Sequence, residues 1–311
     1  MRIVVTGAAG FIGYYLCDRL LRDGHEVIGI DDLSTGQQGN LDELAKRDGF
    51  ASVRLDISTS VALDGPVDLV YNMACPASPV DFESKALHIL DVCSRGTRNM
   101  LELAREKGSS FLHASTSECY GDPREHPQKE SYWGHVNPIG LRAPYDEGKR
   151  FAEALVMTYY RRLEVNTHLV RIFNTYGPRM RSGDGRLLPN LINQAIRGEP
   201  LTIYGDGSQT RSFCYVTDLV DGIVRLMAAD FHEPVNVGSG EELTVLEVAG
   251  RILAITESKS EIVFQPLPQD DPIRRCPDLS RAREVLGWEP TTKTSDGFRR
   301  TVEYFKTVAE R

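Results

Sequence analysis

The chain has 311 residues, of which 41% are hydrophobic and 26% charged, a mixture typical of a globular protein rather than a disordered, fibrous or membrane one. The formal net charge of -8 and the lack of any block of Lys and Arg argue against a nucleic-acid partner. The six cysteines show no C-x-x-C spacing, so we expect neither a metal site nor a disulfide framework, and a reducing, cytoplasmic location.

The N-terminus runs straight into a strand and a glycine turn, which leaves no room for the charged and apolar regions of a signal peptide. No apolar run reaches the length of a membrane span. We therefore expect no membrane partner.

Six apolar runs rich in β-branched residues recur in the N-terminal part, and each predicts a buried strand. Between them lie segments of helical periodicity, chiefly Phe11–Asp23, Lys85–Lys107 and Tyr145–Leu163. Strands that alternate with helices predict a doubly wound parallel sheet, so the expected fold class is α/β and Rossmann-like. The predicted strands are Ile3–Thr6, Val27–Ile30, Val53–Leu55, Leu69–Met73, Phe111–Ala114 and His168–Ile172.

After Asn174 the sequence changes in character, because Gly, Pro and polar residues gather around 177–189. Short strands such as Leu201–Tyr204 and helices such as Leu219–Ala229 follow and predict a smaller lobe. Two further runs, at 213–218 and 235–237, are interpreted as strands of the main body. We therefore expect a main domain at 1–174, with strands that return from about 213–240, and a lobe formed mainly by 175–311.

Glycines mark a tight turn between the first strand and the first helix. The pattern G-x-x-G-x-x-G places them at Gly7, Gly10 and Gly13, with Phe11 and Ile12 in the first helical turn. Such glycines let the backbone approach a pyrophosphate, whose charge is favoured by the free N–H groups of the helix N-terminus. Taken alone, the pattern also fits a glycine turn with a purely structural role.

Acidic residues follow the second and third predicted strands. Asp31 and Asp32 stand where an acid meets the adenosine ribose in dinucleotide-binding folds. No Arg or Lys occurs from residue 33 to residue 40 to neutralise a 2′-phosphate, which favours NAD over NADP. Asp56 and Ile57 are candidates for contacts with adenine. Taken singly, these acids also fit solvated turns, but together with the glycines they predict an NAD site in the main domain.

Tyr145 and Lys149 are four residues apart and therefore lie on one face of a helix. The ammonium group, together with the charge of the cofactor, is expected to lower the pKa of the tyrosine so that it can act as a general base. The strand before this helix ends near Thr116, Ser117 and Glu118, which brings hydroxyls and a carboxylate to the same edge of the sheet. The alternative is an interfacial tyrosine beside a solvated lysine.

The G-x-x-G-x-x-G and Y-x-x-x-K motifs together resemble the extended short-chain dehydrogenase/reductase family of nucleotide-sugar epimerases, dehydratases and decarboxylases. The resemblance covers nearly the whole chain and is strongest to the UDP-glucuronate decarboxylases, which form UDP-xylose. It implies that NAD⁺ oxidises C4 of the sugar, that the 4-keto acid loses CO₂, and that the hydride then returns. The most specific segments are ACPASP (74–79), ASTSECYGDP (114–123), YWGHVNPIG (132–140) and RIFNTYGPRM (171–180).

The resemblance also implies roles for individual residues. Thr116 would bind the C4 oxygen, Ser117 and Glu118 would lie near the sugar ring and its departing carboxylate, and Lys149 would hold the nicotinamide ribose. Arg275, in the motif R-x-P-D, would contact the substrate carboxylate or phosphates or help to protonate C5. The resemblance places Ala74 at the cofactor and Pro79, Asn174, Arg186, Tyr204 and Arg211, with Arg275, at the substrate.

Other functions within the same fold stay open. In the 4,6-dehydratases an Asp that protonates the leaving C6 hydroxyl takes the place of Ser117, and a serine lacks that acid. Glu118 is not the usual companion of a 4-epimerase. A non-catalytic NAD-binding regulator is a further alternative, against which the intact Thr116, Tyr145 and Lys149 argue.

Three residues depart from the decarboxylase pattern, since Asn72, Phe82 and Cys93 stand where His, Tyr and Asn are usual. The change at Phe82 removes a hydroxyl near the sugar. These departures bear on the sugar and on the rate more than on the fold. The resemblance also implies a homodimer that pairs through the helices predicted at 85–107 and 145–163.

Overall fold

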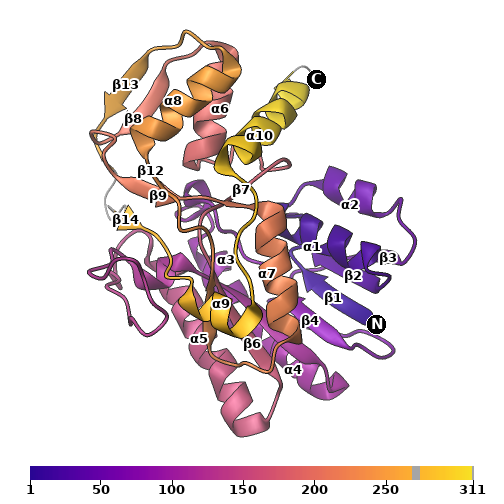
Figure 1. Cartoon of the computed structure of the whole chain (residues 1–311). Coiled ribbons are helices and arrows are strands. Elements are labelled where there is room, and N and C mark those ends of the chain that lie inside the picture. Colours follow the sequence, from indigo (N-terminus) through magenta and orange to yellow (C-terminus); the bar gives the residue numbers. More distant parts are fainter. Residues whose placement is uncertain (268–273, 310–311) are drawn as a thin grey trace.

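The computed structural model describes residues 1–267 and 274–309. Seven strands form one parallel sheet in the order β11-β6-β5-β4-β1-β2-β3, with helices on both faces (Figure 1). The predicted doubly wound α/β fold is therefore confirmed. The strands are β1 (Arg2–Thr6), β2 (Glu26–Asp31), β3 (Phe50–Arg54), β4 (Leu69–Asn72), β5 (Ser110–Thr116), β6 (Thr167–Ile172) and β11 (Pro234–Val237).

The central strands are buried on both faces, which explains why the sequence shows them as continuous apolar runs. The edge strand β3 differs from its prediction, because it begins at Phe50 and ends at Arg54 rather than spanning 53–55. Most of its side chains are at least partly exposed, so the apolar run marks only its carboxyl end. Leu55 continues the pairing there, since its N–H donates to the carbonyl of Asp31 at 3.1 Å.

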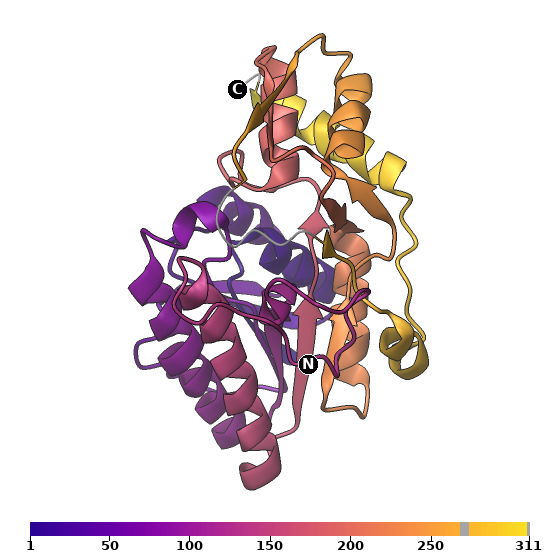
Figure 2. The same ribbon diagram turned by 90° about the vertical axis from the view of Figure 1, so that its left-hand side faces the viewer.

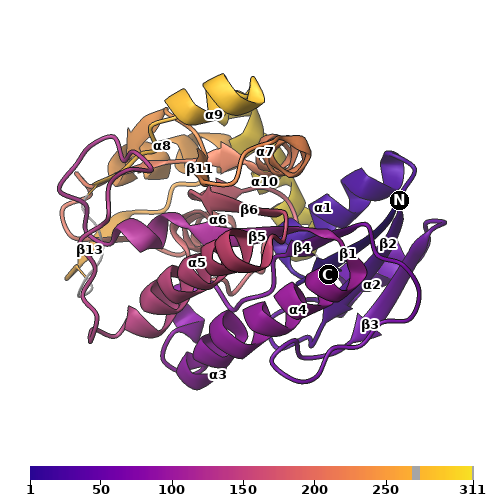
Figure 3. The same cartoon turned by 90° about the horizontal axis from the view of Figure 1, so that it is seen from below.

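Two layers of helices sandwich the sheet (Figure 3). Helices α1 (Phe11–Arg22) and α7 (Val216–Ala228) pack together on one face, and α3 (Ala86–Asp91), α4 (Thr97–Lys107) and α5 (Ala143–Leu163) cover the other. The short helix α2 (Gln38–Leu44) packs on α1. Within residues 1–267 and 274–309, no helix combines the length and the apolar character that a membrane span requires.

A π-helical segment, η2 (Val92–Gly96), joins α3 to α4 within the stretch predicted as one helix. It packs against α5, where Gly148 leaves room for the side chain of Cys93. Single π-turns inside helices are frequent at functional sites. Here the π-turn lies next to the helix that carries Tyr145 and Lys149.

The smaller lobe has a core of its own and lies above the carboxyl edge of the sheet (Figures 1 and 2). Its helices are α6 (Leu187–Arg197), α8 (Val245–Thr256) and α10 (Thr294–Ala309), and its strands β8 (Leu201–Tyr204) and β13 (Ile262–Gln265) pair in parallel. Leu191, Ile203, Ile252 and Phe298 are fully buried among these elements.

The chain returns from the lobe to the main body in several short elements. The strand predicted at 235–237 is confirmed as β11, which pairs with β6. The strand predicted at 213–218 is wrong, because α7 begins at Val216 and only β10 (Cys214–Tyr215) is extended, in a separate pair with β7 (Thr175–Tyr176). A short apolar run that is rich in β-branched residues fits a strand and a buried helix equally well.

Three more strands and one helix complete the connection. The strands β9 (Thr210–Ser212), β12 (Glu242–Thr244) and β14 (Arg274–Arg275) form a small sheet, in which β9 is central. Helix α9 (Ser280–Leu286) packs on β11 and α7. This small sheet returns Arg275 from the lobe to the edge of the main body.

The buried carboxylate of Asp218 ties the segment between α9 and α10 to helix α7. It accepts hydrogen bonds from the N–H groups and hydroxyls of Thr291 and Thr292, at 2.8 to 3.1 Å. The indole N–H of Trp288 donates to the backbone carbonyl of the same residue at 3.1 Å. One acid therefore anchors the chain that leads into the last helix of the lobe.

Replacing Asp218 with Asn should lower the free energy of unfolding by about 2 kcal/mol, because an amide cannot accept as many hydrogen bonds at this buried position. Urea unfolding followed by circular dichroism measures the loss. Asp221→Asn, one turn further along α7, is the matched control. It removes partly exposed ion pairs with Arg19 and Arg225 and should cost no more than about 1 kcal/mol. Equal losses in the two variants would contradict the anchoring role.

Candidate active site

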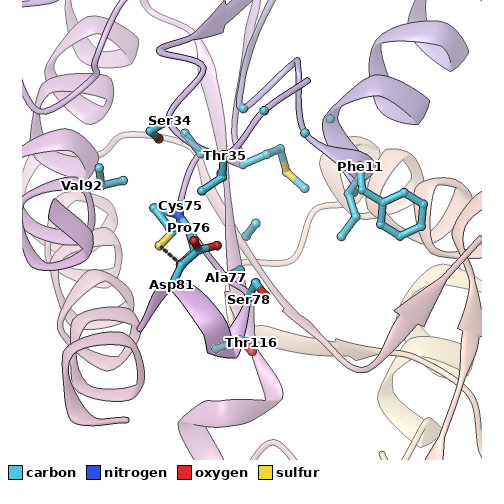
Figure 4. Close-up of a pocket in the computed structure, with 18 of the residues that line it drawn as sticks. Phe11, Ser34, Thr35, Cys75, Pro76, Ala77, Ser78, Asp81, Val92 and Thr116 are labelled. Carbon is cyan, nitrogen blue, oxygen red and sulfur yellow. Dashed lines mark hydrogen bonds between the residues drawn. The ribbon is translucent and has the colours of Figure 1, made fainter. Parts of the chain in front are cut away.

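A large pocket opens at the carboxyl edge of the sheet, where β1 lies next to β4 and the strand order reverses. Ligands of doubly wound folds bind at this point of the topology. In Figure 4 the loop of Cys75–Ser78 lies between the helix that carries Val92 and the turn that carries Phe11. The described part of the lobe contributes Arg181, Asp184 and Arg186 to the wall.

Most of the residues predicted for cofactor and catalysis meet in this pocket. Those that line it are Gly7, Gly10, Phe11, Ile12, Gly13, Asp31, Asp32, Asp56, Ile57, Ala74, Thr116, Ser117, Glu118, Tyr145, Lys149, Asn174 and Arg186. Four predicted substrate residues do not line it. Pro79 begins the 3₁₀ turn η1 (Pro79–Asp81), Tyr204 is 45% exposed at the end of β8, Arg211 lies in β9, and Arg275 is buried behind Glu118.

The glycine turn has the shape that a pyrophosphate needs. Gly7 has a φ of 72°, in the left-handed region that favours glycine. A Cβ on Gly13 would collide with the backbone carbonyl of Gly7, so only glycine lets α1 approach β1 this closely. Gly10 caps α1 without a side-chain hydrogen bond, so the N–H groups of the first turn are available to an anion. The residues present therefore fit a dinucleotide phosphate.

The two acids after β2 have different surroundings. The carboxylate of Asp31 accepts the N–H groups of Ala9 at 2.9 Å and Leu33 at 2.8 Å, so it builds the turn itself, and burial raises its pKa. Asp32 lies at the rim with Asp56, and His88 from α3 joins them, with its Nε2 3.2 Å from the carboxylate of Asp32. Ligand atoms of these three side chains lie within 4.8 Å of one another. No motif in the sequence singles out His88, which reaches this site because α3 brings it beside Asp32 and Asp56.

Lys149 and Thr116 both lie near Tyr145. The ammonium of Lys149 is buried and donates to the carbonyl of Ala114 at 2.8 Å, 6.0 Å from the centre of the Tyr145 ring. The hydroxyl of Thr116 hydrogen-bonds with that of Tyr145 and accepts the N–H of Glu118 at 3.2 Å. The strand end and the helix thus converge as predicted.

The expected lowering of the pKa of Tyr145 is not seen in the chain without its cofactor. Burial raises this pKa well above the ordinary value, Cys75 and Glu118 raise it further, and the hydrogen bond with Thr116 lowers it only in part. The ammonium group of Lys149 lies 6.0 Å from the centre of the tyrosine ring and does not by itself reverse this balance. The predicted lowering of this pKa also relies on the charge of the cofactor.

Glu118 lies between two guanidinium groups at the sugar end of the pocket. Arg275 binds it with both terminal nitrogens, one of them at 2.8 Å, and Arg142 donates to the same carboxylate at 2.7 Å. Burial of Glu118 favours the neutral acid, yet Arg275 and Arg142 outweigh it and lower the pKa to about 2. The sequence analysis predicted Glu118 and Arg275 but missed Arg142, which lies outside the motifs that it used.

The wall of the pocket that the lobe contributes holds two pairs of opposite charge. Arg186 donates to both carboxylate oxygens of Asp184 at 3.0 Å and to the carbonyl of Ala77 at 2.6 Å. Arg181 donates to Asp81 at 2.8 Å. Arginine forks of this kind suit a diphosphate, which would compete with the aspartates for them.

The three departures from the decarboxylase pattern have separate structural roles. Asn72 is buried below the site, where it accepts the hydroxyl of Thr6 at 2.9 Å and contacts His113 at 3.2 Å. Phe82 stacks on the ring of Tyr145, with centroids 4.8 Å apart and planes at 16°. Cys93 places its sulfur 3.7 Å from that of Cys75.

The contact between Cys75 and Cys93 changes the acidity of a thiol in the pocket wall. The hydrogen bond from Cys93 lowers the pKa of Cys75 to about 7, with help from the charge of Lys149 and against the effect of burial. Burial raises the pKa of the other buried thiols, Cys17, Cys119 and Cys214. Cys75 is therefore the thiolate that a reagent entering the pocket would meet.

Cys75 should react with iodoacetamide at pH 8 at least about tenfold faster than the other cysteines, because thiolate is the reactive form. Peptide mass spectrometry after short exposures measures the rates residue by residue. Saturating NAD⁺ should slow the reaction by covering the pocket. Cys93→Ala should also slow it, since the pKa of Cys75 rises without the hydrogen bond, while Cys17→Ala serves as the control. Fastest labelling at any other cysteine would refute this picture.

Comparison with known proteins agrees with this geometry. Residues 3–238 match the NAD dependent epimerase/dehydratase family. The UDP-glucuronic acid decarboxylase 1 of Danio rerio is 47% identical over 309 residues, which cover 99% of this chain and 73% of that protein. The UDP-glucuronic acid decarboxylase 6 of Arabidopsis thaliana is 46% identical over 307 residues, which cover 98% of this chain and 89% of that protein.

Solved structures show the same fold over nearly the full length. A UDP-glucuronic acid 4-epimerase from Bacillus cereus, in complex with UDP-glucuronic acid and NAD, has a TM-score of 0.87 at 29% identity and covers 99% of this chain and 100% of its own. A UDP-glucose 4-epimerase from Thermotoga maritima, solved with UDP-glucose, has a TM-score of 0.90 at 28% identity, with the same two coverages. The chain therefore belongs to the NAD-dependent epimerase/dehydratase family of extended short-chain dehydrogenases/reductases.

Proposed function

We propose that the protein decarboxylates UDP-glucuronate to UDP-xylose. The observation that carries this proposal is the sugar end of the pocket, where an ionised Glu118 is backed by Arg275 and Ser117 replaces the acid of the dehydratases. Ser117 has no proton of suitable acidity for a hydroxyl leaving from C6, which disfavours dehydration. The names of the two relatives from Danio rerio and Arabidopsis thaliana support the same reaction.

Tyr145 acts as the base that removes the proton of the C4 hydroxyl. Tyr145 and Thr116 both line the pocket and interact with each other, so a sugar oxygen bound by Thr116 would lie near the phenol. When bound, NAD⁺ accepts the hydride from C4 and later returns it. Because burial opposes the phenolate, the base needs positive charge nearby, from Lys149 and from the oxidised nicotinamide.

Glu118 and Arg275 act on the carboxylate of the substrate. An ionised Glu118 beside that carboxylate places two like charges together, and the loss of neutral CO₂ moves one of them away from Glu118, onto the C4 oxygen. The electrons of the broken C–C bond pass into the C4 ketone, which becomes an enolate. Arg275 supplies a fixed positive charge at this end of the site while C5 takes up a proton that comes, in net terms, from water.

A 4-epimerase is the second candidate, because the Bacillus cereus structure with the same fold is a 4-epimerase that contains UDP-glucuronic acid. Both reactions begin with the oxidation of C4. They differ in whether the sugar then loses its carboxylate. The same incubation therefore separates them, since epimerisation leaves the mass of the nucleotide sugar unchanged.

Incubation with UDP-glucuronate and NAD⁺ should release CO₂ and form UDP-xylose, as followed by mass spectrometry and NMR. Tyr145→Phe should lower kcat by about 10²- to 10⁴-fold, because no group then removes the C4 proton, while calorimetry should show NAD⁺ binding retained. Tyr160→Phe, on the same helix, is the control and should stay fully active. A new epimer of unchanged mass would replace the decarboxylase by the 4-epimerase, and an inert wild-type protein would favour a regulator.

We also propose that the two parts of the chain bind different ligands. Residues 1–174, with the returning strand β11, bind NAD, and residues 175–311 mainly bind the UDP-sugar. The two separate cores of the main body and the lobe support this division. The free thiols of all six cysteines support a reducing compartment such as the cytoplasm.

We further propose a homodimer that forms through α3 and α5, which pack side by side. Leu87 and Leu90 on α3 and Phe151 on α5 are large apolar side chains that are exposed in the single chain, Leu87 to 79%. Apolar side chains grouped on one face are typical of an interaction surface.

Sedimentation velocity should show a dimer for the wild-type protein, and Leu87→Asp should weaken it at least about tenfold by placing a charge in the apolar interface. Leu246→Asp, at an exposed position of helix α8 in the lobe, is the matched control and should remain dimeric. A monomeric wild-type protein, or dimers that survive the change at Leu87, would refute this interface.

A further inference from the structure

Arg142 was not among the site residues predicted from the sequence, yet it contacts two of the groups that were. It occupies the N-cap position of α5, and its carbonyl accepts the N–H of Tyr145 at 3.0 Å and that of Asp146 at 3.1 Å. Its side chain is only 15% exposed and ends at Glu118. Backbone and side chain of one residue therefore contact both the base and the acid of the site.

The contacts of Glu118 leave its carboxylate fully engaged by guanidinium groups. One oxygen accepts a nitrogen of Arg275, and the other accepts a second nitrogen of Arg275 at 2.8 Å and a nitrogen of Arg142 at 2.7 Å. All three side chains are nearly buried, at 14% exposure for Glu118 and 5% for Arg275. Charge-assisted bonds of this kind orient a carboxylate as well as ionise it.

The guanidinium of Arg142 also contacts the ring of Phe82, which in turn packs against Tyr145. Its central carbon lies 5.4 Å from the centre of the Phe82 ring, and Phe82 stacks on Tyr145. The cation, the phenyl ring and the phenol therefore lie in series. Replacing Arg142 would therefore change the contacts of Glu118 and those of the ring that stacks on Tyr145.

We propose that Arg142 is a positioning residue that, together with Arg275, holds Glu118 as a fixed, oriented carboxylate throughout the reaction. This inference rests on the proposed decarboxylation. Arg275 lies in β14 and Arg142 at the start of α5, so two elements that are far apart in the sequence each bring one arginine to the carboxylate. In this arrangement Glu118 supplies constant negative charge beside the substrate carboxylate and does not donate a proton.

The groups that face Glu118 set the expected pH dependence. Arg275 and Arg142 lower its pKa, while burial raises it, and its charge in turn raises the pKa of Asp146 and of Tyr145. With a pKa of about 2, Glu118 stays ionised wherever the wild-type enzyme works. Without Arg142 the pKa of Glu118 rises, so activity should be lost as the pH falls through that new value.

Arg142→Met keeps an aliphatic side chain against Phe82 and removes the positive charge. Arg142→Lys keeps the positive charge and removes the planar guanidinium group. For the methionine variant we expect kcat with UDP-glucuronate to fall about tenfold or more. The acidic limb of kcat against pH should move up by about one unit or more, and the lysine variant should lie between it and the wild type. NAD⁺ binding should be unchanged in both, because the turn after β1 is not touched.

Arg162→Met, at an exposed position near the end of α5, is the matched control and should leave kcat and its pH profile as in the wild type. A role in stability alone would lower the melting temperature of Arg142→Met but leave the acidic limb where it was, and that result would overturn the proposal. If the methionine variant does not fold, the lysine variant serves as the test, and an acidic limb at the same pH as in the wild type would again overturn the proposal. An inactive wild-type enzyme would instead refute the proposed reaction.

Discussion

The close approach of helix α1 to strand β1 is the constraint on which the rest of the molecule depends. It is possible only because Gly13 has no side chain to meet the carbonyl of Gly7. The approach points the free N–H groups of α1 at the carboxyl edge of the sheet, next to the end of β4. Thr6, the last residue of β1, connects this turn to the neighbouring strand. Its hydroxyl accepts the N–H groups of Met73 and Ala74 at 3.0 Å and so fixes the loop after β4. The end of β1 thus shapes both the glycine turn and the neighbouring wall of the pocket.

The sequence was a good guide wherever a single physical demand decided the structure. Buried parallel strands must be apolar throughout, so their runs located the sheet to within a few residues. The prediction failed where two structures satisfy the same pattern. The run at 213–218 begins with four apolar or aromatic residues and contains the β-branched Val216 and Thr217, yet it becomes the start of α7 after only two extended residues. The π-turn at 92–96 has no sequence signal, because it arises from packing against α5.

The residues of the candidate site likewise fall into those that a sequence pattern could predict and those that it could not. Motifs with fixed spacing, such as the glycine turn and the pair of Tyr145 and Lys149, could be assigned from the chain alone. Arg142 and His88 could not, because their importance comes from tertiary contacts with Glu118 and with Asp32. The acidity of Tyr145 was also beyond the sequence, since spacing shows a neighbouring charge and not the burial that opposes it.

The ion pair between Glu118 and Arg275 spans 157 positions of the chain. Ribosomes add about 5–20 residues per second, so the partner of Glu118 is made roughly 8 to 30 seconds after the acid itself. By the time that residue 149 has been made, the growing polypeptide contains the glycine turn, both acids after β2, Tyr145 and Lys149. A nascent chain therefore acquires the glycine turn and the pair of Tyr145 and Lys149 well before Arg275, the second cation beside Glu118, and the full set of these residues exists only once residue 275 has been made.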